Sequence, residues 1–267
     1  MNQKKIAIIG GGNLGSAIAE GLVFSKIFPN ENITITRRKV HLLEKFKARG
    51  LKILTDNAKA VRNADIILLA VKPYQVIDIL TEIKPFLTPD KIMVSMVAGI
   101  SFQTIEKETG HGVKLFRAMP NTAIAICESM TCLAYPKRSE SSKDEVLELF
   151  NKLGKTTVIN EELMSAATVL GACGIAFALR YLRASMQGGI EIGFSAEVAQ
   201  FITAQTVRGA SELILNSDHH PEQEIDKVTT PRGVTISGLN EMEHKGFSSA
   251  LIHGLVTSYR KIDNDNK

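Results

Sequence analysis

The feature that most constrains this chain is the glycine turn GGGNLG, which directly follows the apolar run Ile6–Ile9 and directly precedes a helical pattern. A strand, a glycine-rich turn and a helix in this order are typical of the first unit of a dinucleotide-binding fold. The glycines permit the tight turn, the approach of a pyrophosphate and close packing of the helix, whose free N–H groups attract phosphate. The residues expected to hold the phosphates are Gly10, Gly12, Asn13, Leu14 and Gly15. The alternative is that these glycines are required only for the shape of the turn and bind no ligand.

Strand-like and helix-like runs alternate through the first part of the chain. Short, apolar, β-branched runs predict buried strands at Ile6–Ile9, Ile33–Thr36, Ile66–Ala70, Ile92–Val97, Val113–Phe116, Met130–Ala134 and Thr156–Val158. Helical patterns lie between them at Leu14–Phe24, Val40–Arg49, Tyr74–Phe86 and Ser142–Leu153. The alternation predicts an α/β domain over residues 1–160, a Rossmann-type, doubly wound parallel sheet with helices on both faces.

From about residue 161 onward, small residues recur at helical spacing and strand-like runs are few. Residues Glu162–Ile192 predict one helix of about 46 Å at 1.5 Å per residue, bending or ending near Gly188 and Gly189. Further helices are expected at Ser195–Asn216, Gly233–Lys245 and Ser248–Ile262. One small domain cannot bury so long an apolar helix, so we expect an all-α dimerisation domain over residues 161–267 and a homodimer formed through this helix. Its uncharged part, Leu163–Leu179, is too short for a membrane span, and we expect it to be buried among helices.

Composition argues against several classes of protein. The net charge of +4 is spread along the chain rather than gathered into the basic stripe that nucleic-acid binding usually shows. Three cysteines, Cys127, Cys132 and Cys173, supply neither a disulfide framework nor a complete zinc site. The N-terminal apolar run breaks into glycines too soon for a signal peptide. We therefore expect a cytoplasmic protein with no metal site, no nucleic-acid partner and no membrane attachment.

The carboxyl end of the second predicted strand indicates which dinucleotide is bound. NAD-binding folds place Asp or Glu there, where the side chain binds the ribose 2′-hydroxyl. This chain has Thr36, Arg37 and Arg38 instead. Guanidinium groups bind a 2′-phosphate with paired N–H donors, so we expect NADPH. The alternative is that the two arginines begin a solvated helix.

More candidate ligand contacts follow the third, fourth and fifth predicted parallel strands, because this fold binds ligands at the carboxyl ends of its strands. The loops there are small or contain proline, which suits contact with a flat cofactor ring. The residues are Ala70, Val71, Lys72, Pro73, Ala98, Gly99, Met119, Pro120 and Asn121. Lys72 is expected to contact a phosphate or ribose, with an ordinary surface lysine as the alternative.

A second anion site is predicted at Thr230–Thr235. Thr230 and Pro231 are typical of a helix cap and a first helical turn, where proline is tolerated. The backbone N–H groups at such a helix start are free to receive a carboxylate. A helix cap without a ligand is the alternative.

Taken together, these segments resemble the pyrroline-5-carboxylate reductase family from Lys5 to about Arg260. The resemblance rests on GGGNLG, AVKP at Ala70–Pro73, VAGIS at Val97–Ser101, RAMPNT at Arg117–Thr122 and, most specifically, TTPRGVTISGL at Thr229–Leu239. It implies NADPH-dependent reduction of L-1-pyrroline-5-carboxylate to L-proline, the last step of proline biosynthesis, by hydride transfer to the cyclic imine. A protonated imine is already electrophilic, so positioning and electrostatics carry most of the rate. The family also implies dimers arranged in a ring.

The resemblance implies roles for individual residues. Asn57 matches a position that contacts the adenosine side of the cofactor. The backbone of Thr230, Gly233 and Val234 would hold the substrate carboxylate. The hydroxyl of Thr235, the expected catalytic residue, would lie near the ring nitrogen.

Four residues depart from the family pattern. Arg232 stands where the family usually has Gly, and Glu224 where it has an aliphatic residue, while Ile175 and Phe177 replace the more usual Pro and Tyr. These departures either tune substrate fit or reflect repacking at a dimer interface. Because Arg232 adjoins the predicted carboxylate site, we hypothesise that it strengthens substrate binding.

Three rival functions follow from the same features. A β-hydroxyacid dehydrogenase would need a catalytic lysine on the long helix, and no lysine occurs between Lys155 and Lys227. An NADPH-dependent reductase of a larger or different cyclic imine is harder to exclude and is the main alternative. A non-catalytic NADPH-binding regulator would use the glycine turn and the arginines, but it would have no use for the anion site at Thr230–Thr235.

Overall fold

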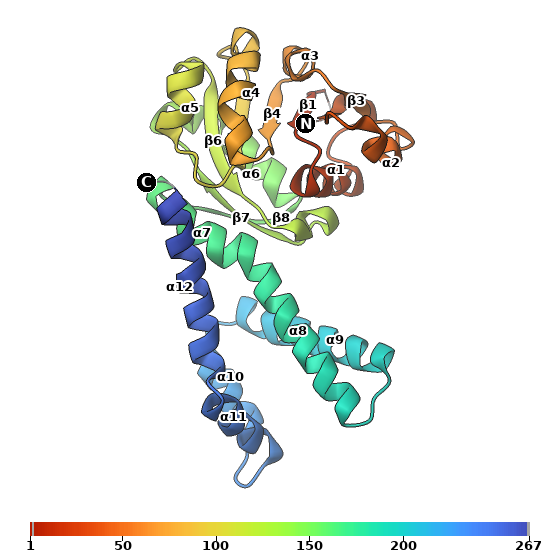
Figure 1. Cartoon of the computed structure of the whole chain (residues 1–267), viewed down its shortest axis with the longest axis vertical. Helices are drawn as coiled ribbons and strands as arrows, with labels where there is room; N and C mark the ends of the chain where they lie inside the picture. Colours follow the sequence, from red (N-terminus) through yellow and green to blue (C-terminus); the bar gives the residue numbers. More distant parts are fainter. Residues whose placement is uncertain (2, 266–267) are drawn as a thin grey trace. The chain divides into compact units, whose positions relative to one another are not determined.

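The computed structural model describes Met1 and residues 3–265 of the chain (Figure 1). Its contacts group into two compact units. The first comprises Met1–Cys173 together with Tyr259–Lys267, and the second comprises Gly174–Ser258. The division thus falls inside the long helix, and the domain boundary expected between residues 160 and 161 stays a prediction.

The first unit is built on an eight-stranded sheet with the order β3-β2-β1-β4-β5-β6-β7-β8. The strands are β1 (Ile6–Ile9), β2 (Ile33–Thr36), β3 (Lys52–Leu54), β4 (Ile66–Leu69), β5 (Ile92–Ser95), β6 (Lys114–Met119), β7 (Ser129–Ala134) and β8 (Gly154–Val158). Parallel pairing aligns Ile9 with Thr36 and with Leu69, so that the strand ends that carry the predicted loops lie along one edge. The Rossmann-type fold predicted from the alternating pattern is confirmed.

Helices cover both faces of this sheet, which is why its central strands are apolar without alternation. Ile6 and Ile8 of β1 belong to one buried cluster, while Ala7 and Ile9 belong to the other. The first cluster includes residues of α1 (Asn13–Ser25), α2 (Glu44–Lys47) and α6 (Lys143–Asn151). The second includes residues of α3 (Asn57–Arg62), α4 (Val76–Ile83), α5 (Phe102–Thr109) and α7 (Met164–Ala167). Short 3₁₀ turns occupy Asn30–Asn32, Val40–Leu43, Pro73–Gln75, Lys84–Phe86, Thr122–Ile126, Lys137–Ser142 and Glu161–Leu163.

The sheet is parallel from β3 to β6, as predicted, but its last two strands run in the opposite direction. β7 pairs antiparallel with β6, and β8 runs parallel to β7. The link between β6 and β7 spans residues 120–128 and holds only a 3₁₀ turn, too short for the crossover that a parallel return requires. Three short elements were also not predicted, namely β3, α3 and α5, because each carries only a few patterned residues.

The second unit is helical, as predicted. The helix Glu161–Glu191 is continuous and 31 residues long. It contains a π-helical segment at Thr168–Cys173, and α8 (Gly174–Glu191) forms its second half. The helix continues through Gly188 and Gly189 and ends at Glu191, within one residue of the predicted end. Gly193 follows, with a φ of 112° that suits glycine.

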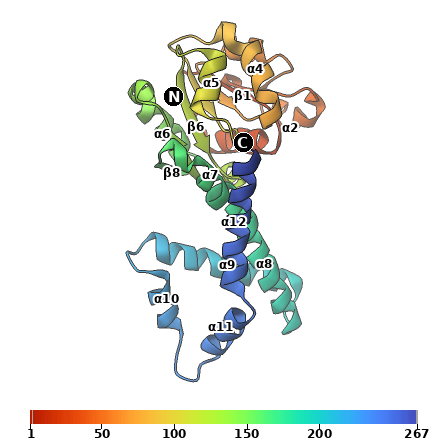
Figure 2. The same ribbon diagram turned by 60° about the vertical axis from the view of Figure 1, so that its left-hand side comes forward.

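Four more helices follow α8. They are α9 (Ala196–Leu215), α10 (Pro221–Val228), α11 (Val234–His244) and α12 (Phe247–Asp265). Figure 1 and Figure 2 both show α9 beside α8. A Cβ on Gly189 would lie 3.1 Å from the Ala199 Cβ, so glycine allows the two helices to approach closely there. Of these helices only α10 was not predicted.

The second unit has almost no core of its own. Ala199 is its one buried residue, and large apolar side chains such as Phe201 and Leu215 are 73% and 75% exposed. By length and composition, Glu161–Glu191 could cross a membrane, and only 17% of its most apolar window is buried. The burial that we expected for this helix is therefore not supplied within the single chain. Monomeric soluble proteins rarely expose so much contiguous apolar surface, so this unit needs a covering partner.

Candidate functional site

The glycine turn has the geometry that its sequence predicts at Gly10 and at Gly15. Gly10 has a φ of 104°, and a Cβ there would lie 2.6 Å from the Ala70 carbonyl oxygen. A Cβ on Gly15 would lie 2.0 Å from the Gly10 carbonyl oxygen. Side chains at either position would collide with backbone, so both glycines are needed for the turn itself.

Gly12 is different, because nothing in the chain requires its small size. Its φ of −78° and ψ of −161° are open to any residue, and a Cβ there would meet nothing within 4 Å. Gly12 is the cap residue of α1, and no side chain caps this helix. The first N–H groups of α1 therefore face open space with a favourable dipole, which fits a pyrophosphate at this turn.

The end of β2 is tied to the turn by three hydrogen bonds. Thr36 is only 2% exposed, and its Oγ1 accepts from Gly10 N at 3.2 Å. Gly11 N donates to the Thr36 carbonyl at 2.6 Å, while Arg37 Nη1 donates to the Gly11 carbonyl at 2.7 Å. Arg38 is exposed. The buried Thr36 thus holds the turn through its bonds to Gly10 and Gly11. The guanidinium groups of Arg37 and Arg38 add positive charge next to it.

Asn57 begins α3 next to the same strand end. Its Oδ1 accepts from Thr36 Oγ1 at 2.7 Å, and its Nδ2 donates to Glu82 Oε2 on α4 at 2.9 Å. The Asp56 carboxylate caps α3 by accepting from Lys59 N at 2.7 Å. The structure therefore brings Asn57 within hydrogen-bonding distance of a residue of the predicted cofactor set.

The remaining predicted contacts follow β4, β5 and β6. Sheet register aligns Leu69 with Ser95 and Ser95 with Arg117, so the loops after these strands lie along one edge with the glycine turn. Met119 is the last residue of β6, and the other predicted residues lie on the loops, namely Ala70, Val71, Lys72, Pro73, Ala98, Gly99, Pro120 and Asn121. The Lys72 ammonium is exposed and makes no ion pair with a described residue. The Asn121 side chain is used within the protein, because its Oδ1 accepts from Ala123 N at 3.1 Å and its Nδ2 donates to the Gly171 carbonyl at 3.4 Å.

The helix start predicted at Thr230 and Pro231 is wrong. Gly233 N donates to the Thr230 carbonyl at 2.8 Å and closes a turn, and α11 begins only at Val234. Arg232 has a φ of 62° in the third position of this turn, a conformation outside the helix. Gly233 is the cap residue, again without a side-chain cap. A Cβ on Gly233 would lie 2.9 Å from the Thr230 carbonyl oxygen, so the turn favours glycine there.

The corrected turn still leaves donors at the start of α11. Val234 is 90% exposed, and Thr235 is exposed with no hydrogen bond from its hydroxyl to any residue that the structure describes. The Gly233 N–H is already used within the turn. Free donors at this helix start are therefore the N–H groups that follow Gly233 and the Thr235 hydroxyl.

Comparisons with known proteins bear on both sites. A family model for pyrroline-5-carboxylate reductase dimerisation matches residues 161–264, and one for NADP oxidoreductase coenzyme F420-dependent matches residues 5–99. Pyrroline-5-carboxylate reductase 1 of Dictyostelium discoideum is 48% identical, with 96% of this chain and 49% of that relative covered. Pyrroline-5-carboxylate reductase 2 of the same organism is 43% identical, with 97% and 92% covered. The crystal structure of Plasmodium falciparum pyrroline carboxylate reductase with NADP bound matches over 100% of both chains, with a TM-score of 0.92 and 27% identity.

This chain belongs to the pyrroline-5-carboxylate reductase family. It is an oxidoreductase with an NADP-type dinucleotide-binding domain, as the glycine turn and arginines predicted. The chain spans about half the length of the first Dictyostelium relative and nearly the whole of the second. The match to the dimerisation model shows that its helical part serves oligomerisation.

Glu224, which departs from the family pattern, has local partners that explain a charge at this position. Its Oε1 lies 2.7 Å from Lys227 Nζ and 2.6 Å from His219 Nδ1. Hydrogen bonds from Lys227 and then His219 hold the pKa of the Glu224 carboxyl below its ordinary value. His220 caps α10, because its Nδ1 accepts from Glu222 N at 3.3 Å. Nothing in the structure explains why Ile175 and Phe177 replace the family's more usual Pro and Tyr.

One ion pair, between Arg117 on β6 and Glu161 at the start of the long helix, was missed by sequence reasoning. Arg117 Nη1 lies 2.8 Å from Glu161 Oε1, and the same oxygen accepts from Phe102 N at 2.7 Å. Glu161 begins the long helix, Arg117 is buried on β6, and Phe102 is the first residue of α5. A basic residue inside a strand that otherwise faces a core was the available signal, because a buried charge needs a partner.

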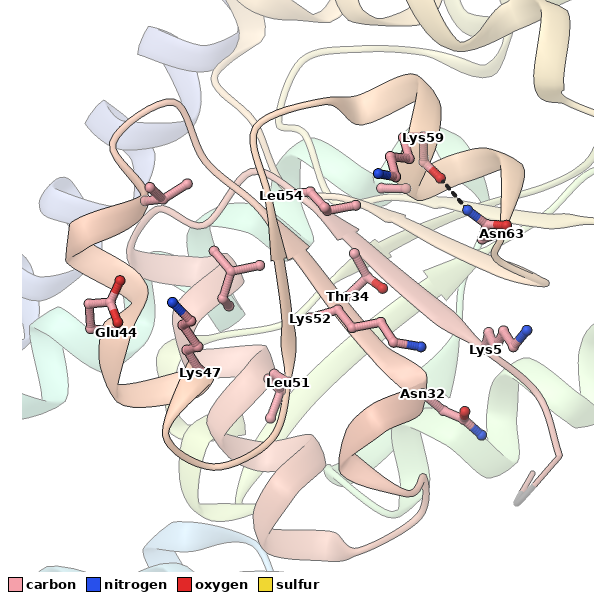
Figure 3. A pocket seen from close by; sticks show the side chains of 13 residues that line it. Lys5, Asn32, Thr34, Glu44, Lys47, Leu51, Lys52, Leu54, Lys59 and Asn63 are labelled. Atoms are coloured by element: carbon pink, nitrogen blue, oxygen red, sulfur yellow. Dashed lines mark hydrogen bonds between the residues drawn. The ribbon is translucent and has the colours of Figure 1, made fainter.

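The cavity along the open edge of β3 is separate from both sites (Figure 3). It has a volume of about 650 Å³, and none of its lining residues belongs to the predicted cofactor or substrate set. Its lysines come from different segments, with Lys5 before β1, Lys47 on α2, Lys52 on β3 and Lys59 on α3. Lysines are common protection for an exposed sheet edge, and we give this cavity no functional role.

Proposed function

We propose that this chain reduces L-1-pyrroline-5-carboxylate to L-proline with NADPH, the last step of proline biosynthesis. The observation that carries the proposal is the presence of two helix starts without a side-chain cap, at Gly12 and Gly233, in a chain that is 43% identical over nearly its whole length to a named pyrroline-5-carboxylate reductase. One helix start suits a pyrophosphate and the other suits a carboxylate.

The cofactor is held at the edge of the sheet where the parallel strands end and the glycine turn lies. The N–H groups of Gly12, Asn13 and Leu14 bind the pyrophosphate, because no side chain competes for them. Arg37 and Arg38 bind the 2′-phosphate. The Arg37 guanidinium is already held beside the turn by the Gly11 carbonyl. When bound, reduced nicotinamide supplies a hydride to the carbon of the C=N bond, whose electron pair passes to the ring nitrogen.

The substrate is held at the start of α11. The backbone N–H groups of Val234 and Thr235 bind its carboxylate, since the Gly233 N–H is used in the turn with Thr230. The free Thr235 hydroxyl bonds the ring nitrogen and keeps it oriented. The exposed Arg232 guanidinium adds a positive charge that attracts the carboxylate. Orientation and charge, rather than a proton relay, supply the catalysis.

We also propose that two copies of the chain form a homodimer through the long helix, within a larger ring of dimers. Support comes from exposed apolar side chains on the long helix itself, which include Leu170, Leu179 and Ile190. A second copy of the same helix would cover them. We place the enzyme in the cytoplasm, where three cysteines that form no disulfide stay reduced.

The proposal is tested by purifying the full chain and following NADPH oxidation with pyrroline-5-carboxylate, with NADH in parallel. Saturable oxidation that favours NADPH is the expected result. A preference for NADH would keep the reaction and overturn the role of Arg37 and Arg38. NADPH binding without oxidation would favour another cyclic imine as substrate or a regulator that binds NADPH without catalysis.

A further inference from the structure

Glu82 is an exposed acidic residue outside every motif, yet it is joined to the glycine turn by a continuous chain of hydrogen bonds. Its Oε2 accepts from Asn57 Nδ2 at 2.9 Å. Asn57 Oδ1 accepts from Thr36 Oγ1 at 2.7 Å, and Thr36 Oγ1 accepts from Gly10 N at 3.2 Å. The chain links α4, α3, β2 and the turn after β1.

Chemistry sets the direction of each bond in this chain. The Gly10 N–H can only donate, so the Thr36 hydroxyl accepts it and sends its single proton toward Asn57. A carboxylate can only accept, so Glu82 must face the amide nitrogen of Asn57. With the amide turned over, the Asn57 oxygen would face the Glu82 oxygen, and the Thr36 proton would lose its acceptor. Thr36 and Glu82 therefore select the same orientation of Asn57.

This orientation matters for binding because one N–H of Asn57 Nδ2 has no acceptor among the residues that the structure describes. An amide held in one orientation offers that donor to a ligand without first losing rotational freedom. Glu82 is exposed, so its bond to Asn57 adds little to fold stability. Its effect is expected in cofactor binding rather than in folding.

We propose that Glu82 is a positioning residue for NADPH, which acts by orienting the Asn57 amide toward the adenosine part of the cofactor. This inference rests on the proposed function, because it takes Asn57 as a cofactor contact. Glu82 itself needs no contact with the cofactor.

The test measures the dissociation constant of NADPH by fluorescence titration of the full-length protein, for the wild type and four single variants. Glu82→Ala removes the acceptor, and Glu82→Gln keeps an acceptor oxygen without the charge. Asp78→Ala is the matched control, because Asp78 is an exposed carboxylate on the same helix with no hydrogen bond to a described residue. Asn57→Ala, alone and combined with Glu82→Ala, completes a double-mutant cycle.

We expect Glu82→Ala to raise the dissociation constant about threefold or more, a size typical of one hydrogen bond. Glu82→Gln should stay close to the wild type, Asp78→Ala should have no effect, and Glu82→Ala should add nothing in the Asn57→Ala background. In turnover, the rise in KM for NADPH should exceed any fall in kcat. A purely structural role would lower the melting temperature and kcat instead.

Other outcomes separate this inference from the proposed function. A wild type that binds no NADPH overturns both. A wild type that binds, with Glu82→Ala unchanged or tighter, overturns the positioning role alone. A full effect of Glu82→Ala in the Asn57→Ala background would do the same, because Glu82 would then act by another route.

Discussion

Two glycines of the same turn should respond in opposite ways to the addition of one methyl group. A Cβ on Gly15 would lie 2.0 Å from the Gly10 carbonyl oxygen, far inside van der Waals contact, whereas a Cβ on Gly12 would meet nothing within 4 Å. Gly15→Ala therefore forces a backbone shift, and Gly12→Ala does not. Comparing the two variants therefore distinguishes an effect on the stability of the fold from an effect on ligand binding.

The expected sizes follow from these contacts. Overpacking of a rigid site costs about 1–3 kcal/mol, so Gly15→Ala should lower the melting temperature of the free protein by several degrees. At Gly12 the loss of a good cap residue and the stiffer unfolded chain nearly cancel, within about 0.5 kcal/mol. Its methyl group would stand where the pyrophosphate approaches, so we expect the dissociation constant of NADPH to rise about tenfold or more, which corresponds to about 1.4 kcal/mol.

Thermal denaturation without cofactor and fluorescence titration with NADPH measure the two effects separately. Gly12→Ala should retain its melting temperature and lose affinity, while Gly15→Ala should lose stability first. If Gly12→Ala binds NADPH as the wild type does, the phosphates do not lie against this turn. If the melting temperature of Gly12→Ala falls as far as that of Gly15→Ala, then Gly12 has no open space for a methyl group and the structural argument is wrong.

Two further predictions concern stability and substrate binding. Lys91 is 9% exposed and its ammonium donates to the carbonyls of Val61, Arg62 and Ala64 at the end of α3, so Lys91→Met should cost about 1–3 kcal/mol in a denaturant titration. Lys107→Met, at an exposed lysine, is the control and should change the free energy of unfolding by less than about 0.5 kcal/mol. Arg232→Gly should stabilise the chain by about 1 kcal/mol, because it relieves a φ of 62°, and should raise the KM for the imine. An unchanged KM would contradict the role of Arg232 in substrate binding.

Most of the first unit could be predicted from its sequence because its signals are local. Strand, glycine turn and helix follow one another within Ile6–Ser25, and the conformation of each is encoded by neighbouring residues. The seven predicted strands are all observed, with ends that differ by a few residues. The reversal of β7 and β8 was missed, since direction depends on how a short link crosses the sheet rather than on the strands themselves.

The substrate segment shows where local signals mislead. Thr230 and Pro231 have the composition of a helix start, yet the observed cap, Gly233, lies three residues after the predicted cap. The decisive feature is the φ of Arg232, which the closing hydrogen bond from Gly233 to Thr230 maintains. The arginine itself gives no signal for that conformation, and the available signal was the glycine that the family usually has at this position.

By itself the sequence determined the dinucleotide-binding fold, the NADP-type cofactor and the family, because motifs of contiguous residues carry all three. Only the tertiary structure decided which side chains act on those motifs. Asn57 meets Glu82 across 25 residues, and Arg117 meets Glu161 across 44. Such partners lie on different elements, and they come together only after the sheet and its helices have packed.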